Sequence, residues 1–171
     1  MKLTFDRPLL GASETAGVIE KDGDRIGEMK RSFRPPHERP GKSPQYDVNI
    51  QITAGKDTYE ITQQTFSISG GHHWMLTHNG RNIGEITSPK GLKAKHHIEL
   101  HSSDLPPLFI QAAWKGNAIL SVNGNDIGET KAAGFLFNAA YITEINAPET
   151  EIAPPLLAGL VFTFWSSHTR G

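Results

Sequence analysis

Short runs in which apolar and polar residues alternate, separated by turn residues, follow one another along almost the whole chain. A period of two is typical of half-buried strands, because successive side chains point to opposite faces of a sheet. The connections are too short for parallel crossovers, so we expect a mostly antiparallel sheet that closes into a barrel or divides into a sandwich. The predicted strands are Leu3–Phe5, Ala16–Glu20, Arg25–Lys30, Tyr46–Ile52, Thr58–Gln63, Thr65–Ser69, Trp74–Thr77, Arg81–Thr87, Lys95–Leu100, Leu108–Gln111, Ala118–Val122, Asp126–Lys131, Phe135–Phe137 and Tyr141–Ile145.

One motif, Asx-Gly-x-x-Ile-Gly-Glu, occurs three times, beginning at Asp22, Asn79 and Asn123. Asp-Gly and Asn-Gly favour a type I′ turn, which needs positive φ at both central residues, so each copy predicts a β-hairpin. The second glycine has two explanations. It forms a β-bulge, which would turn both Ile26 and Met29 towards the core, or it allows another backbone to approach closely. The uneven spacing of the copies argues against a solenoid or a propeller.

The last apolar run, from Ile152 to Trp165, differs from the predicted strands because it does not alternate. Pro154 and Pro155 suit the first turn of a helix, and the preceding Glu151 suits the positive end of a helix dipole. A helix that is apolar on every face lies in a protein core or in a membrane. A bilayer span needs about 20 apolar residues, which is longer than this run. We therefore expect a buried core helix at about 154–167, with a tail anchor as the alternative.

Composition indicates one domain, 1–171, that is long enough to bury a sizeable core. The chain has no cysteine, which excludes disulfides, thiolate ligands and a cysteine nucleophile. Seventeen basic and eighteen acidic side chains nearly cancel, so a nucleic-acid partner is not expected. The first residues, Met1–Arg7, lack the apolar stretch of a signal peptide, and we expect a cytoplasmic protein.

A closed antiparallel barrel around an apolar C-terminal helix resembles the tubby C-terminal domain-like superfamily, which includes tubby, the phospholipid scramblase domain, the LURP-one-related proteins and small bacterial members. The resemblance depends on the order of elements over nearly the whole chain: an N-terminal strand, the repeated Asx-Gly, Ile-Gly-Glu hairpins, and the final segment Leu156–Trp165. It implies a single barrel domain of about twelve strands around a central helix. For tubby itself it implies phosphoinositide binding through a basic surface. The near-neutral charge departs from that surface, and the sequence contains no lipid-binding motif to carry over.

The segment 31–44 is rich in proline and arginine. Proline cannot donate to a sheet and breaks helices, so we expect an extended surface loop. The side chain of Phe33 could insert into a headgroup layer or into a pocket of a partner. Each basic residue near an anionic membrane adds about 1 kcal/mol to the free energy of membrane binding. The alternative is a solvated linker without a specific role. The candidate ligand- or membrane-binding residues are Lys30, Arg31, Phe33, Arg34, Arg39 and Lys42.

Most histidine residues of the chain lie between residues 72 and 101. On a strand, His97, Glu99 and His101 would share one face, and two imidazoles with a carboxylate form a ligand set for zinc or non-haem iron. Alternate residues of a strand stand about 7 Å apart, however, which is wide for one shared ion. A metal site on this strand is therefore a weak alternative to exposed histidines on the outer face of the sheet.

No nucleophile elbow, zinc-protease motif or phosphate-binding glycine loop is present in the sequence. We expect a non-enzymatic binding module that acts through protein–protein contact, without a cofactor and without a transmembrane span. The alternative is peripheral binding of anionic phospholipid or phosphoinositide, and the third reading is a metal-dependent enzyme that uses the His-rich strand. Trp74, Trp114 and Trp165 are expected to pack in the core or at a barrel end.

Overall fold

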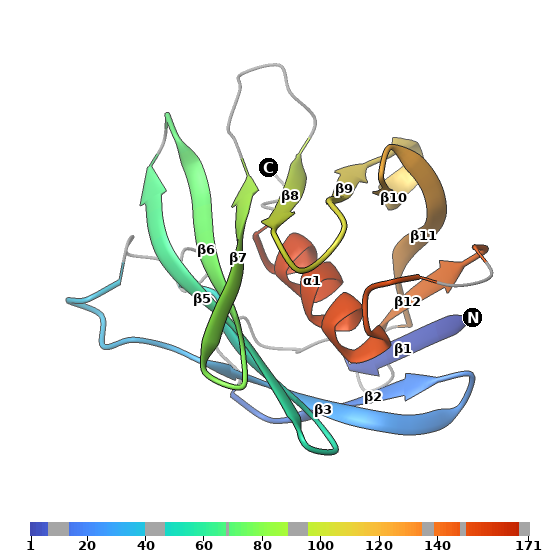
Figure 1. Ribbon diagram of the computed structural model, residues 1–171, viewed down its shortest axis with the longest axis horizontal. Coiled ribbons are helices and arrows are strands. Elements are labelled where there is room, and N and C mark those ends of the chain that lie inside the picture. Colours follow the sequence, from blue (N-terminus) through green and yellow to red (C-terminus); the bar gives the residue numbers. More distant parts are fainter. Residues whose placement is uncertain are drawn as a thin grey trace.

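The computed structural model describes residues 1–6, 14–39, 47–67, 69–88, 96–134, 139–147 and 150–167. These residues form a closed antiparallel β-barrel around one C-terminal helix (Figure 1), which confirms the predicted fold class. The strands are β1 (Lys2–Asp6), β2 (Gly17–Lys21), β3 (Asp24–Ser32), β4 (Asn49–Ala54), β5 (Asp57–Ser67), β6 (Gly71–His78), β7 (Arg81–Ser88), β8 (His97–Ser102), β9 (Leu108–Ala112), β10 (Asn117–Val122), β11 (Asn125–Ala133) and β12 (Ala140–Ile145), and the helices are η2 (Trp114–Gly116) and α1 (Pro154–Ser167).

Each strand pairs with its neighbours in sequence, and the last strand closes the barrel against the first. In this closing pair Leu3 of β1 lies opposite Thr143 of β12. The two terminal strands thus have no open edge that would template pairing with another chain. The predicted strands Thr58–Gln63 and Thr65–Ser69 are one strand, β5, with a register shift between Gln63 and Thr65. The predicted strand Phe135–Phe137 lies outside the described residues.

The three predicted hairpins are present as β2–β3, β6–β7 and β10–β11. Asp22, Asn79 and Asn123 have φ of 53°, 49° and 51°, as type I′ turns require. In β6–β7, Leu76 pairs with Gly84 and Thr77 pairs with Asn82, so Ile83 is the extra residue of a bulge. The other two hairpins show the same register shift.

Both explanations of the second glycine in the motif hold. A Cβ at Gly27, Gly84 or Gly128 would lie 2.7, 2.6 or 2.1 Å from a carbonyl oxygen of the following strand, so a side chain cannot be accommodated there without movement. The bulge also turns the isoleucine and the third residue after it towards the core. Ile83 and Ile86 are 8% and 0% exposed.

The hairpins recur at every fourth strand, so the barrel consists of three four-stranded repeat units, β1–β4, β5–β8 and β9–β12. The backbone nitrogens of Asp22, Asn79 and Asn123 each donate to a carbonyl of the first strand or of the residue just before it, at 2.8, 2.8 and 3.2 Å. In the first two units the Asx side chain accepts a bond back from that same residue, Lys2 or Thr58. The third unit has Pro107 at this place, which has no N–H to donate.

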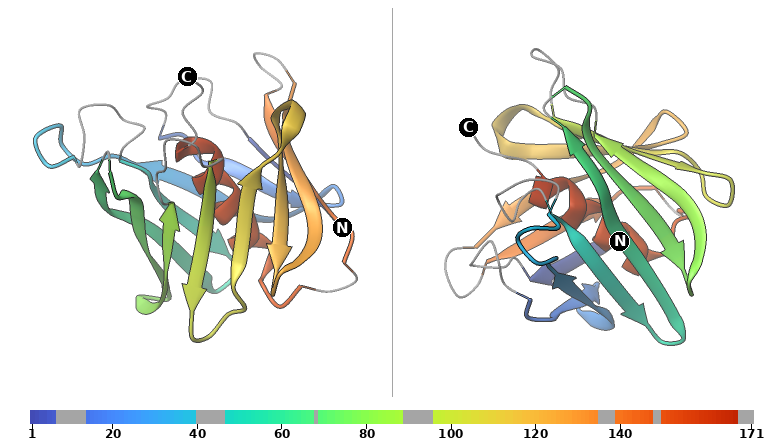
Figure 2. Two further views of the ribbon diagram at one scale, coloured as in Figure 1. Left: turned by 90° about the horizontal axis from the view of Figure 1, so that it is seen from above. Right: turned by 90° about the vertical axis from the view of Figure 1, so that its left-hand side faces the viewer.

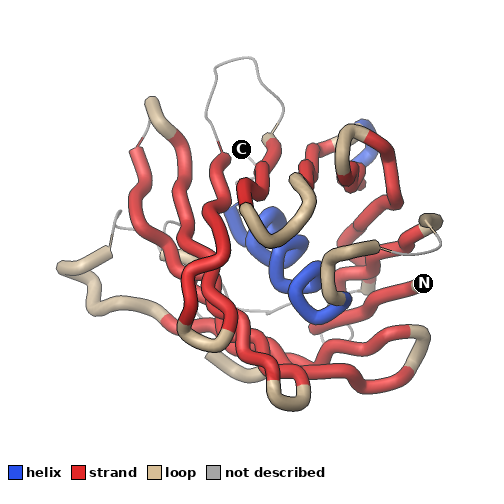
Figure 3. The backbone as a smooth tube through the Cα atoms, viewed as in Figure 1, coloured by secondary structure: helices blue, strands red, loops and turns tan. Residues whose placement is uncertain are grey.

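Helix α1 runs through the middle of the barrel, with the strands around it (Figure 3). From Leu156 to Trp165 its side chains are buried on every face, which confirms the predicted core helix. It approaches β4 closely at Gly159, where a Cβ would lie 2.5 Å from Cδ1 of Ile52. No helix of the described residues is long and apolar enough to cross a membrane.

The two ends of the barrel differ. One end, which we call the turn end, carries the three Asx-Gly turns. The other, which we call the loop end, carries η2, the end of β3, the start of β4 and the C-terminal end of α1 (Figure 2). Loops at one end of a rigid barrel are the usual place for binding residues.

Candidate functional site: the clamped segment at the loop end

The interior of the first repeat unit differs from the other two at the loop end. Arg31 stands four residues after Gly27, where the other units place Ser88 and Ala132 after their bulge glycines. Its side chain points inwards from β3 and is only 6% exposed, so the expectation that Arg31 lies in an exposed loop is wrong. Burial lowers the pKa of Arg31 to about 10, while Tyr141 and Asp47 favour its charged form.

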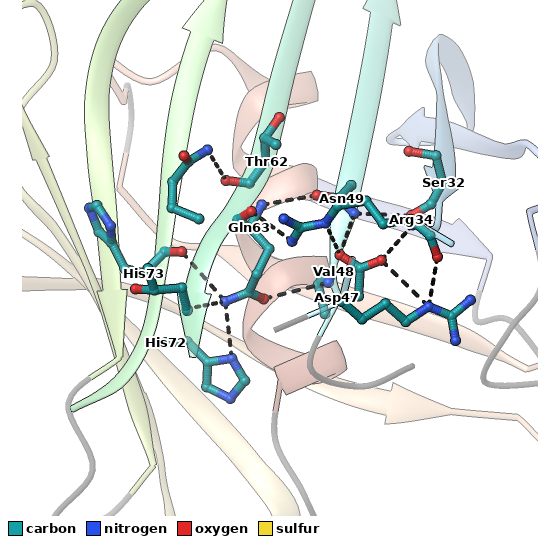
Figure 4. Close-up of polar contacts among 12 residues, drawn as sticks. Ser32, Arg34, Asp47, Val48, Asn49, Thr62, Gln63, His72 and His73 are labelled. Carbon is teal, nitrogen blue, oxygen red and sulfur yellow. Dashed lines mark hydrogen bonds and ion pairs between the residues drawn. The ribbon is translucent and has the colours of Figure 1, made fainter. Parts of the chain in front are cut away.

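A buried carboxylate holds the connection after β3. The side chain of Asp47 is fully buried. It accepts hydrogen bonds from the backbone nitrogen and from Nε of Arg34, at 2.6 and 2.8 Å, and from Nδ2 of Asn49 at 2.9 Å (Figure 4). Nε of Arg39 lies 3.8 Å from the same carboxylate. We call Asp47, Arg34, Arg39 and Asn49 the Asp47 clamp.

The hydrogen bonds of the clamp decide the charge of Asp47. Burial alone would raise the pKa of this carboxyl group. The donors from Asn49 and Arg34 outweigh that effect and hold the pKa below its usual value. Asp47 therefore stays ionised at neutral pH, and its charge is matched by guanidinium groups at the surface of the barrel.

The clamp continues into the barrel through Gln63 of β5. Nη2 of Arg34 donates to the carbonyl of Gln63 at 2.8 Å, and the backbone nitrogen of Gln63 donates to Oδ1 of Asn49 at 3.0 Å. The Gln63 side chain is fully buried; its Nε2 donates to Thr65 O at 2.8 Å and lies 3.3 Å from Nδ1 of His72 (Figure 4). The clamp is thus fixed to strands on both sides of β4.

Residues 33–39 form a loop, while Arg31 and Ser32 of the predicted loop 31–44 belong to β3. The ring of Phe33 is close to two guanidinium groups, with its centroid 4.6 Å from Cζ of Arg31 and 5.7 Å from Cζ of Arg39. Phe33 is therefore packed, not projecting. The side chains that the loop exposes are Pro35, Pro36, His37 and Glu38, in a turn closed by a bond from Glu38 N to Pro35 O at 2.9 Å.

The cations predicted to bind ligand have different positions. Lys30 is exposed on the outer face of β3, and Lys42 lies outside the described residues. Arg34 and Arg39 are engaged by Asp47. In the described part of this segment, fewer cationic side chains are therefore free to bind a ligand than the sequence predicted.

The structure brings the three predicted metal ligands together on the outer face of β8. Nε2 of His97 lies 3.4 Å from Oε1 of Glu99, and Nε2 of His101 lies 3.4 Å from Oε2. The two imidazoles thus face different oxygens. Throughout the described ranges, no group of three or more histidine or carboxylate side chains is arranged to hold a metal ion.

The three tryptophans differ in exposure. Trp74 and Trp165 are buried, as predicted, but Trp114 in η2 is 84% exposed at the loop end, so the packing expectation for Trp114 is wrong. Among the described residues, Trp114 is the exposed large hydrophobic side chain.

Sequence reasoning did not identify Asp47, Asn49 or Gln63. One signal was present, because Gln63 continues the inward positions of Tyr59 and Ile61 and is the first polar residue among them. Asp47 has no such signal, since its partner Arg34 lies on the other side of the β3–β4 connection. Comparison of the chain with protein-family models, with curated proteins and with solved structures finds no match.

Proposed function

We propose that the protein is a non-enzymatic binding module that contacts a partner protein through the turn Pro35–Glu38 at the loop end. The observation that carries this proposal is the Asp47 clamp. It fixes an exposed, proline-rich turn to the barrel through a fully buried carboxylate. A surface loop that is already ordered loses little conformational entropy when it binds, which favours recognition.

The cost of the clamp supports a role beyond stability. A buried ion pair contributes little net stability compared with apolar side chains of the same volume. Arg31, which directly precedes the clamped loop, is a further buried charge that the other two repeat units lack, because they carry Ser88 and Ala132 at its place. The closed barrel around a C-terminal helix is also what the resemblance to the tubby-like superfamily implies, and we include that relationship in the proposal.

The test places a photo-crosslinking amino acid at His37 in cells that express the protein. A control carries it at Lys56, an exposed residue of the β4–β5 turn at the other end of the barrel. We expect a protein adduct from position 37 and none of the same mass from position 56. In binding measurements with that partner, Pro35→Ser with Pro36→Ser should weaken affinity about tenfold with an unchanged melting temperature. Equal adducts from both positions would contradict the proposal.

Peripheral membrane binding is the second candidate, and Trp114 is the observation that favours it. Tryptophan is enriched at membrane interfaces, and Trp114 is 84% exposed at the loop end. Anionic vesicles should then shift the fluorescence of the protein to the blue at low salt, and Trp114→Ser should remove the shift. The engaged guanidinium groups of Arg34 and Arg39 make this candidate weaker than protein contact.

A further inference from the structure

A hollow of about 230 Å³ lies on the outer face of the sheet beside the clamped loop. It crosses β3, β4 and β5, and its lining includes Lys30, Ser32, Gln51, Glu60 and Thr62. Lys30, Gln51 and Glu60 form one row across the three strands, because Lys30 pairs with Gln51 and Gln51 pairs with Glu60. Ser32 directly precedes the loop, so the hollow and the turn Pro35–Glu38 belong to one continuous surface.

The Asp47 clamp makes the hollow. Asn49 of β4 would normally project outwards between Ser32 and Thr62. Instead its amide donates to Asp47 and to the carbonyl of Ser32, at 2.9 and 3.3 Å, and its oxygen accepts from Gln63 N (Figure 4). The side chain is consequently only 8% exposed, and Asn49 itself lines the hollow between Ser32 and Thr62.

The walls offer donors of hydrogen bonds. Lys30 is exposed and forms no ion pair with any residue in the part of the chain that the structure describes. The hydroxyl groups of Ser32, on the same face of β3, and of Thr62, on the opposite wall, are also without protein partners within the described ranges. The ammonium group of Lys30 and the hydroxyl group of Ser32, on the same wall, are a donor pair that suits a carboxylate, and the hydroxyl group of Thr62 is a separate donor on the opposite wall.

Glu60 restricts where an anion can sit. Its two oxygens already accept from Nε2 of Gln51 at 3.2 Å and from Oγ1 of Thr77 at 3.4 Å, so its charge is held at the β5 side of the hollow. Lys30 lies two strands away, about 9.5 Å in sheet geometry. A negative group is therefore attracted to the β3 wall and repelled from the β5 wall, which fixes its orientation.

We infer that the hollow receives a glutamate or aspartate side chain of the partner protein, with its carboxylate on Lys30 and Ser32. This inference rests on the proposed function and names the partner chemistry: an acidic segment that lies across β3 to β5 next to the turn Pro35–Glu38. The hollow has room for one such side chain, and Thr62 and Oε1 of Gln51 remain for its main chain.

The test uses the full chain, labelled with ¹⁵N, and a blocked peptide of consecutive glutamates as the probe. We expect the peptide to shift the backbone amide signals of Lys30, Ser32, Gln51 and Thr62, and a matched glutamine peptide to leave them unchanged. Lys30→Glu should weaken the response at least about fivefold, and salt above about 0.3 M should do the same. The control Lys56→Glu, at the turn end, should respond like the unmodified protein.

Two further experiments test whether the hollow binds a phosphate group or a lipid headgroup instead of a carboxylate. Inorganic phosphate and vesicles of phosphatidylcholine with phosphatidylserine are added in place of the peptide. If either shifts the same signals while the glutamate peptide does not, the inference is wrong. An equal response of Lys30→Glu and the unmodified protein also overturns it. The crosslinking result at His37 is independent of these outcomes, so the failure of the hollow is distinguishable from the failure of the proposed function.

Discussion

Arg34 holds Asp47 twice: its backbone nitrogen donates to Oδ2 at 2.6 Å and its Nε donates to Oδ1 at 2.8 Å. One residue of the loop thus supplies both a main-chain and a side-chain donor to one buried carboxylate. The side chain of Arg34 is 30% exposed whereas that of Asp47 is fully buried, so the pair lies at the boundary between barrel and solvent. If the carboxylate of Asp47 were removed, water could still solvate the guanidinium group of Arg34, but the loop would lose its attachment to the barrel.

Asp47→Ala should lower the free energy of unfolding by about 3 kcal/mol or more, because it leaves the donors of Arg34 and Asn49 without their acceptor. The measurement is urea denaturation followed by circular dichroism. Asp104→Ala is the matched control, since Asp104 forms an exposed ion pair with Arg81, and its removal should cost less than about 1 kcal/mol. Equal losses in both variants would show that the clamp does not stabilise the fold.

The clamp also predicts how stability depends on acid. The pKa of Asp47 is lower in the folded protein than its ordinary value of 3.8, so below about pH 4 the unfolded chain binds a proton first. The stability that Asp47 contributes is present above that pH and is lost as pH falls towards the folded pKa. Asp57, bonded to His78, has a lowered pKa as well and adds to the same loss. Between about pH 2 and 6, the free energy of unfolding should therefore change less with pH for Asp47→Ala than for the unmodified protein.

Gly84→Ala should destabilise the second repeat unit. The new Cβ would lie 2.6 Å from the carbonyl oxygen of His101, a backbone atom that cannot move without disturbing the β7–β8 pairing. We expect a loss of about 1–3 kcal/mol in thermal or urea unfolding. The control is Gly80→Asn in the adjacent turn, where φ is +79° and space is open, so asparagine should be tolerated. A Gly84→Ala variant as stable as Gly80→Asn would contradict the close approach.

Arg31→Met should leave stability unchanged or raise it by up to about 3 kcal/mol. Burial lowers the pKa of Arg31 to about 10, because the interior solvates its charge poorly. An apolar side chain of similar length keeps the contact with Phe162 without that cost. Arg31→Ala is the control, because it should leave a cavity and destabilise. A clear loss of stability in Arg31→Met would show that the bonds of the guanidinium outweigh its desolvation.

The parts of the fold that local sequence dictates could be predicted. Alternation located the strands, and Asn79 and Gly80 dictated a hairpin because both adopt positive φ. The three repeat units were not recognised, because the spacing of the motifs is uneven while their place in the strand order is regular. Strand order is a property of tertiary pairing, which spacing along the chain does not show.

The sequence predicted where the candidate site lies along the chain, but not which of its side chains are buried or which residues they contact. Proline content placed a loop after β3, but it gave no means of telling which arginine is buried. Arg31 lies inside because the pairing of Ser32 with Asn49 extends β3 beyond the bulge. Asp47 could not be found because its partner is 13 residues away and the two residue types are common at any surface. The exposure of Trp114 likewise depends on the short helix η2 that carries it.

Leu160→Asp should unfold the protein. Leu160 is 0% exposed in the core of the barrel, so the change buries an unpaired carboxylate and removes a core side chain. Each effect costs several kcal/mol, and the total stability of a domain is only about 5–15 kcal/mol. We expect loss of the cooperative melt and of soluble protein. Ser166→Asp, on the same helix but only partly buried, is the matched control and should remain folded.

Removing the chain from Ile152 onwards tests the same helix without introducing a charge. The strands would then enclose an empty centre where Leu157, Leu160 and Phe164 are now fully buried. A barrel of this width cannot fill that space with its own strand side chains, so the truncated chain should aggregate or lose its β-type circular dichroism. A tail anchor would predict the opposite, a truncated protein that is more soluble and melts cooperatively. That outcome would contradict the role of α1 as the core of the barrel, and with it the tubby-like resemblance that rests on this helix.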